Sequence, residues 1–149
     1  MQPFRKTVKL TIPARAEYID IARLSLYGIA NKMGFSYEDI EDMKVAVAEA
    51  CNNSVLHAYP NRESGSIDLE FDMKDTELAI TISDQGKSFD YEDKAKELSA
   101  HHNKELEQIS AGGLGIYLMQ ALMDKVEVLS GGGTRVVLTK YLTAVNPGA

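Results

Sequence analysis

The sequence contains a single cysteine, Cys51, so a disulfide framework within the chain is excluded. No apolar run approaches the length of a membrane-spanning helix, and the N-terminus lacks the apolar core of a signal peptide. The sequence also lacks a basic excess: its formal net charge is −6, which disfavours direct binding to a nucleic-acid backbone. We therefore expect a cytoplasmic protein that binds neither nucleic acid nor membrane directly. Cys51 has apolar neighbours and is expected to be a buried structural thiol.

The 149 residues suffice for one domain, and the sequence has no internal repeat or interdomain linker. Apolar periodicity predicts strands at 7–12, 66–73, 77–84, 126–128 and 134–142, and helices at 15–33, 36–59 and 114–123. A polar segment at about 87–111, with a possible short helix near 91–98, is long for a loop and is therefore expected to be mobile and functional or disordered. A flexible tail is expected at 143–149. This order predicts a two-layer α/β sandwich, with a mixed, mostly antiparallel sheet and three helices on one face.

The second predicted helix carries the first departure from a simple core pattern. Ser36 and Asp39 resemble a capping box at its start. Its core-facing stripe consists of Ile40, Met43, Val47, Ala50, Cys51 and Ser54. Glu49 is the only charged side chain from residue 45 to residue 56, and an unpaired buried charge is costly. Glu49 is therefore expected to be paired, bound to a metal or shifted in pKa.

Asn53 and His57 follow Glu49 at i+4 and i+8, so they lie about 40° and 80° around the helix from it. Glu49 and Asn53 fit either a polar helix edge facing water or a magnesium site completed by phosphates and waters. In the second case, Glu49 also suits a general base. His57 fits either a ligand contact or a cation near the helix C-terminus.

Asp84 is the second departure, because the alternation in its strand places this acid on the apolar face. It stands two residues before the chain-breaking Gly86. One alternative is a structural acid that accepts backbone N–H groups. The other is an acceptor for a ligand amine, such as the exocyclic amine of adenine, with Gly86 letting a flat ring lie close to the backbone. The residues alone leave both alternatives open.

The segment Gly112-Gly113-Leu114-Gly115 opens the third predicted helix. Free N–H groups and the positive end of a helix dipole favour phosphate there. The segment is not a Walker A loop, because no Gly-Lys-Ser/Thr follows, and it opens no Rossmann unit, because a polar loop precedes it. His101 and His102, in that loop, have no further ligand at metal-binding spacing and are typical of solvated histidines.

The order of these short motifs along the chain resembles the order of the motifs in a known superfamily. Glu49-x-x-x-Asn53, Asp84-x-Gly86, Gly112-Gly113-Leu114-Gly115 and Gly133-Thr134 resemble the successive boxes of the GHKL (Bergerat-fold) ATPases and kinases. Over about residues 8–142 the chain is most similar to the anti-sigma-factor serine kinases of the RsbW type. The segments that carry this closer resemblance are 40–44, 49–59, 84–90, 112–119 and 139–141.

The resemblance implies a site for ATP and Mg²⁺. Asn53 resembles the amide that ligates the ATP-bound Mg²⁺, and Glu49 the general base or the carboxylate that orients the attacking group. Asp84 resembles the acid that reads the adenine amine, with Gly86 beneath the ring and Thr134 supporting adenine through Asp84 or a water. The resemblance also implies nucleotide contacts from His57, Gly112, Gly113, Leu114 and Gly115, and an ATP lid at 87–111.

One residue of the predicted lid departs from the superfamily pattern, and one role in the lid is not assigned to a residue. Ser88 stands where a second glycine is often found, a change that RsbW-type kinases tolerate. The lid holds no arginine, and its lysines are Lys87, Lys94, Lys96 and Lys104. The cation that meets the γ-phosphate is therefore left open.

The resemblance implies an anti-sigma factor that is also a serine-protein kinase. It would phosphorylate a serine of an anti-anti-sigma partner, sequester a stress-type sigma factor and form a homodimer, for which strand 7–12 offers an edge. The chain length leaves no room for the phosphoacceptor hairpin of a histidine kinase or the transducer domain of a gyrase-type ATPase. Two alternatives stay open: a nucleotide-binding anti-sigma module without kinase activity, and a related switch kinase of another pathway.

Overall fold

The computed structural model describes residues 5–58, 65–86 and 111–143. The possible helix near 91–98, His101, His102, the lid up to residue 110 and the tail from residue 144 lie outside these ranges. In chain order the elements are β1 (Arg5–Pro13), a 3₁₀ turn (Ala16–Tyr18), α1 (Ile19–Met33), α2 (Tyr37–Asn53), a π-helical turn (Ser54–Ala58), β2 (Ser66–Lys74), β3 (Glu77–Asp84), α4 (Ala111–Leu122), β4 (Lys125–Ser130) and β5 (Thr134–Tyr141). No helix in the described ranges is long and apolar enough to cross a membrane.

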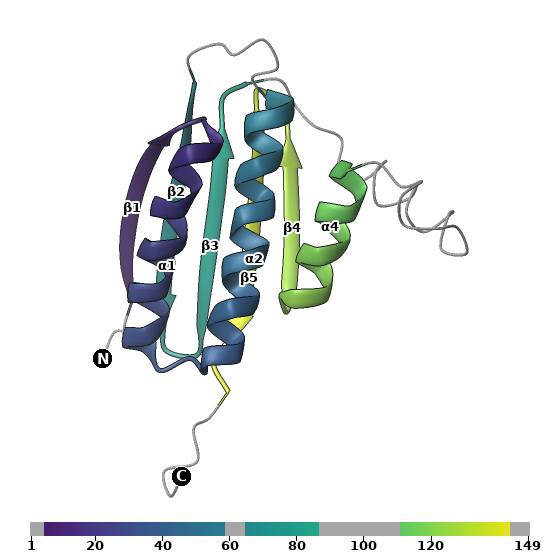
Figure 1. The fold of residues 1–149 in the computed structure, drawn as a ribbon. Helices are drawn as coiled ribbons and strands as arrows, with labels where there is room; N and C mark the ends of the chain where they lie inside the picture. Colours follow the sequence, from purple (N-terminus) through teal and green to yellow (C-terminus); the bar gives the residue numbers. More distant parts are fainter. Residues whose placement is uncertain (1–4, 59–64, 87–110, 144–149) are drawn as a thin grey trace, which may run out of the picture.

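Within the described residues, five strands form one sheet in the order β1-β2-β3-β5-β4, and every neighbouring pair is antiparallel. Figure 1 shows α1, α2 and α4 covering one face of this sheet. The predicted two-layer sandwich is therefore confirmed, with a sheet that is antiparallel rather than mixed. Strand β5 enters between β3 and β4, and this insertion makes Asp84 the cross-strand partner of Thr134.

The core lies between the sheet and the helices. In β2, Ile67, Leu69 and Phe71 are buried, while the residues between them are exposed, because successive side chains of a strand point to opposite faces. On the helical side, Leu26 of α1 and Met43 of α2 are fully buried. Each large apolar side chain buried in this way stabilises the fold by about 1.5–3 kcal/mol, so this layer carries most of the stability.

The end of α1 and the start of α2 follow the sequence prediction, whereas the start of α1 does not. The predicted helix at 15–33 begins as a 3₁₀ turn and becomes α-helical only at Ile19. Short 3₁₀ turns are frequent at the N-termini of α-helices. Gly34 ends α1 with a left-handed φ of 92°, the conformation for which glycine is suited. Ser36 caps α2, as predicted: its Oγ accepts from the backbone N–H of Asp39 at 3.1 Å.

Two helix boundaries near the predicted site differ from the prediction. The second helix is α-helical only to Asn53 and then widens into a π-helical turn. Helix α4 begins at Ala111, three residues before the predicted start, so Gly112 and Gly113 lie inside its first turn. Glycine has a low helix propensity, which hid this start in the sequence. Packing of α4 against α2 supplies the stability that propensity does not.

Cys51 is the buried structural thiol that the sequence predicts. It lies in α2 with no exposed surface and is not disulfide-bonded. Burial raises the pKa of the Cys51 thiol to about 12, and the charge of Arg23 opposes this rise only in part. The thiol is therefore protonated at neutral pH and has little nucleophilic character.

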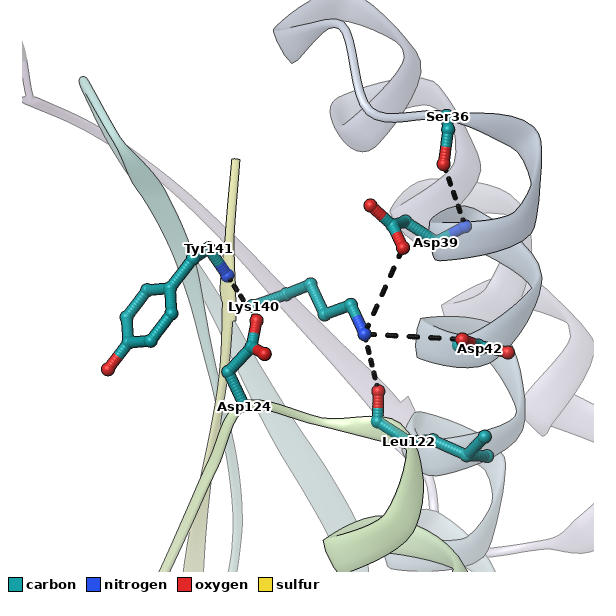
Figure 2. Close-up of polar contacts among 7 residues, drawn as sticks. All are labelled: Ser36, Asp39, Asp42, Leu122, Asp124, Lys140 and Tyr141. Carbon is teal, nitrogen blue, oxygen red and sulfur yellow. Dashed lines mark hydrogen bonds and ion pairs between the residues drawn. The ribbon is translucent and has the colours of Figure 1, made fainter. Parts of the chain in front are cut away.

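Lys140 of β5 joins the start of α2 and the end of α4 to the sheet (Figure 2). Its ammonium group donates to the backbone carbonyl of Leu122, the last residue of α4, at 2.6 Å. The same nitrogen lies 4.0 Å from a carboxylate oxygen of Asp39 and 4.0 Å from one of Asp42, both in α2. The side chain of Lys140 is 12% exposed. One lysine thus fixes the C-terminal end of α4 relative to the first turns of α2.

Replacing Lys140 by Met is expected to lower the free energy of unfolding by about 2 kcal/mol, because the Leu122 carbonyl and both aspartates lose their donor. At this chain length that loss corresponds to roughly 4–8 °C in melting temperature, which calorimetry measures. Lys125→Met is the matched control, because among the described residues Lys125 forms only an exposed pair with Glu127. The melting temperature of this variant should stay within about 2 °C of the wild type. Equal melting temperatures for the two variants would contradict the role given to Lys140.

Candidate functional site

Four chain segments that carry the predicted site residues meet at one end of the molecule. Figure 1 shows the C-terminal ends of α2 and β3 and the first turn of α4 at the same end. Strand β5 begins there too, because Thr134 pairs with Asp84 at the end of β3. Helices α2 and α4 pack against each other. The fold therefore brings together residues that are up to 85 positions apart, from Glu49 to Thr134.

The carboxylate of Asp84 is buried at this end, with 4% of the residue exposed. Its Oδ2 accepts from the hydroxyl of Ser54 at 2.8 Å. Its Oδ1 accepts from the backbone N–H of Gly86 at 3.2 Å and from that of Thr134 at 3.3 Å. Burying a carboxylate is tolerable only when such donors compensate for the lost water. The inward position predicted for Asp84 is confirmed, and the backbone contacts of the structural alternative are present.

Gly133 sets the distance between the β4–β5 turn and Asp84. Its φ is +120°, and a Cβ placed there would overlap the backbone carbonyl oxygen of Asp84. Only glycine leaves room for this close approach. The approach in turn lets the next residue, Thr134, direct its backbone N–H at the Asp84 carboxylate. A cavity of about 190 Å³ lies beside this contact, with Ser83, Asp84 and Thr134 in its wall.

Ser54 is a contact that the sequence analysis missed. The helical periodicity places it in the core-facing stripe of the second helix, and the residue is indeed buried, with 7% exposed. A buried hydroxyl needs a hydrogen-bond partner, and Asp84 is the other polar residue that the pattern directs inward. Pairing the two polar exceptions would have found this contact from the sequence.

Glu49 and Asn53 converge on one glycine of α4. A Cβ built on Gly115 would lie 2.9 Å from Oε2 of Glu49, 3.6 Å from Nδ2 of Asn53 and 3.8 Å from its Oδ1. Gly115 is buried, Glu49 is partly buried and Asn53 is 4% exposed. The wet helix edge that the sequence left open for Asn53 is therefore wrong, since helix α4 covers this face of α2.

The side-chain amide of Asn53 is not satisfied within the described residues, because its buried Nδ2 has no hydrogen-bond partner. An unsatisfied buried polar group is rare in folded proteins, and an ordered water or a bound ion can complete one. Rotating the side-chain amide of Asn53 by 180° exchanges its nitrogen and its oxygen, so Oδ1 then occupies the position of Nδ2. Amide and carboxylate oxygens are the protein ligands that Mg²⁺ accepts, so Asn53 beside Glu49 fits such an ion.

The remaining predicted site residues are placed only in part. Leu114 and Gly115 lie in α4, and Gly112 and Gly113 in its first turn. His57 lies in the π-helical turn, and its side chain is outside the described part of the structure. A larger groove of about 680 Å³, between α1 and α2, contains none of the predicted site residues in its described lining.

Comparisons with known proteins show to which family this chain is similar. The family model described as the histidine kinase-like ATPase domain matches residues 12–140. The serine-protein kinase RsbW of Bacillus velezensis is 45% identical to this chain, covering 91% of the chain and 85% of the relative. That of Bacillus licheniformis is 47% identical with the same coverage. A solved structure of the RsbU and RsbW domains of a Mycobacterium tuberculosis protein has a TM-score of 0.66 at 21% identity, covering 92% of this chain and 32% of that one, a likeness in fold alone.

Gly133→Ala is expected to lower the melting temperature by about 10 °C or more, because overlap with the Asp84 backbone adds to the strain of the positive φ. Gly131→Ala is the matched control: Gly131 has a φ of +127° but open space around a new Cβ. This control carries only backbone strain of about 1–2 kcal/mol and should melt roughly 2–8 °C below the wild type. If the two variants melt at the same temperature, the close approach to Asp84 is not what requires glycine.

Proposed function

This chain belongs to the RsbW-type serine-protein kinases of the histidine kinase-like ATPase family, and we propose that it transfers the γ-phosphate of ATP to a serine of an anti-anti-sigma protein and sequesters a sigma factor. The observation that carries this proposal is the convergence of Glu49 and Asn53 on Gly115, beside Ser54, whose hydroxyl donates to the inward carboxylate of Asp84. The proposed setting is the cytoplasm, where both partner proteins act.

Asp84 would read the base of ATP. Its carboxylate accepts three hydrogen bonds, and a carboxylate has about four acceptor positions, so one position remains for the 6-amino group of adenine. Gly86 and Thr134 hold the carboxylate through their backbone N–H groups. In this proposal Gly86 also lies beneath the adenine ring, where a side chain would obstruct it.

The phosphates would lie between α2 and the first turn of α4. The N–H groups of Gly112, Gly113 and Leu114 are at the helix N-terminus, where the macrodipole favours anions. Asn53 would hold Mg²⁺ through its amide oxygen, a role that its unsatisfied buried amide supports. A bound Mg²⁺ would neutralise charge that develops on the phosphate oxygens. His57 would contribute from the turn after α2.

Glu49 would act on the incoming serine. Its carboxylate would accept the hydroxyl proton while the serine oxygen forms a bond to the γ-phosphorus and the bond to the β,γ-bridging oxygen breaks, releasing ADP. The contact of Glu49 with Gly115 supports this role, because it directs the carboxylate toward the helix whose N-terminus would hold the phosphates. A side chain at residue 115 would displace that carboxylate.

The proposed assembly is a homodimer that binds either a sigma factor or its antagonist. Strand β1 is an edge of the sheet within the described residues, with β2 as its neighbour, so its free edge is available to a second copy. The net charge of −6 supports a partner with basic regions. Two other functions remain as alternatives: an anti-sigma module that binds nucleotide without transfer, and a switch kinase of another pathway.

Glu49→Gln is expected to retain ATP binding but to phosphorylate the anti-anti-sigma protein about 10²–10⁴-fold more slowly, because the amide cannot accept the serine proton. The measurement combines isothermal titration with ATP·Mg²⁺ and a single-turnover transfer assay with labelled ATP. Glu38→Gln provides the matched control, because Glu38 is an exposed residue in the first turn of the same helix.

Wild-type transfer by the Glu49→Gln variant would refute the catalytic role of Glu49. ATP binding without transfer by the wild-type chain would instead favour the binding module.

The chain alone is expected to have a solution mass of twice 16.4 kDa, which light scattering after size exclusion measures.

A tagged chain with ADP or ATP should recover a sigma factor and a small serine-containing antagonist from the source cell. Recovery of neither protein would count against the proposed pathway and favour the switch kinase.

A further inference from the structure

Ser54 occupies a position that links the two halves of the site. It directly follows Asn53 and opens the π-helical turn Ser54–Ala58. Its hydroxyl donates to Oδ2 of Asp84 at 2.8 Å in a buried environment. This hydroxyl therefore connects the end of α2, which carries Asn53, to the acid at the end of β3.

The hydrogen bonds of Asp84 are divided unequally between its two oxygens. Oδ1 accepts from two backbone N–H groups, those of Gly86 and Thr134. Among the described residues, Oδ2 accepts only from Ser54. Each carboxylate oxygen has about two acceptor positions, so the position left for a ligand N–H is on Oδ2, the oxygen that Ser54 holds.

A serine hydroxyl has one proton, and in this structure that proton is directed at Asp84. The Ser54–Asp84 pair therefore presents acceptors and no donor to a ligand at this point. An amino group on a purine ring can donate to such a pair. A carbonyl oxygen at the same ring position would meet the lone pairs of Oδ2 and find no proton.

We propose that Ser54 determines nucleobase specificity by fixing Oδ2 of Asp84 for the 6-amino group of adenine and against the 6-oxo group of guanine. This inference rests on the proposed function, because it assumes that the site binds ATP. Ser54 acts through Asp84 and is a positioning residue rather than a catalytic one.

The test compares wild type and Ser54→Ala by isothermal titration with three nucleotides. These are ATP, GTP and purine riboside triphosphate, which lacks any group at ring position 6. Ser54→Ala is expected to lower the affinity for ATP about 10-fold and to change the affinity for the purine analogue by no more than about twofold. The ratio of the ATP affinity to the GTP affinity should therefore fall about 10-fold. A merely structural serine would weaken all three nucleotides alike, so the ratio between ligands separates the two roles.

Two further variants serve as controls. Thr11→Ala removes a matched hydroxyl–carboxylate bond, since Thr11 donates to Asp68 at 2.6 Å on the exposed side of β1 and β2, and it should leave all three affinities unchanged. Ser54→Thr keeps the hydroxyl and should retain more of the preference for ATP over GTP than Ser54→Ala.

The outcomes distinguish this inference from the proposed function. If the wild-type chain binds no ATP, both are overturned. If the wild type binds ATP and Asp84→Asn weakens that binding, while Ser54→Ala changes the three affinities equally or not at all, then only the inference on Ser54 is overturned.

Discussion

The buried carboxylate of Asp84 is the constraint on which this end of the molecule depends. A charge with 4% of its residue exposed is tolerable only if donors surround it, and the donors come from three separate segments: Ser54 after α2, Gly86 after β3 and Thr134 of β5. None of these segments is near another in sequence. The need to satisfy one acid therefore fixes the end of the long helix relative to the sheet.

Helix α2 carries the arrangement from this acid to the neighbouring helix. Glu49, Asn53 and Ser54 lie within two turns, so their relative positions follow from the helix itself. At the opposite end of the layer, Lys140 connects α4 and β5 to Asp39 and Asp42 in the first turns of α2. With α2 held at both ends and α4 held at its C-terminal end, the two helices meet at Gly115, the residue on which Glu49 and Asn53 converge.

The elements and the inward acid were predictable from the sequence because they depend on local periodicity. The inward position of Asp84 follows from the alternation of apolar and polar residues along its strand, and the Ser36 cap follows from a short motif. Three features were not predictable in this way. Insertion of β5 between β3 and β4 is a tertiary choice that hairpin rules do not decide. The start of α4 is hidden by glycines whose low propensity packing overrides. Ser54 was assigned to the core, because periodicity reports burial and not hydrogen bonding.

The two glycines at the site limit it in different ways. Gly133 meets the backbone of Asp84, which cannot move without separating two paired strands, so the spacing at that end is rigid. Gly115 meets the far end of the Glu49 side chain, which has rotatable bonds, so the spacing there is adjustable. In the proposed function, the rigid end would hold the base, which ATP and ADP share. The adjustable end would face the γ-phosphate, the part in which ATP and ADP differ.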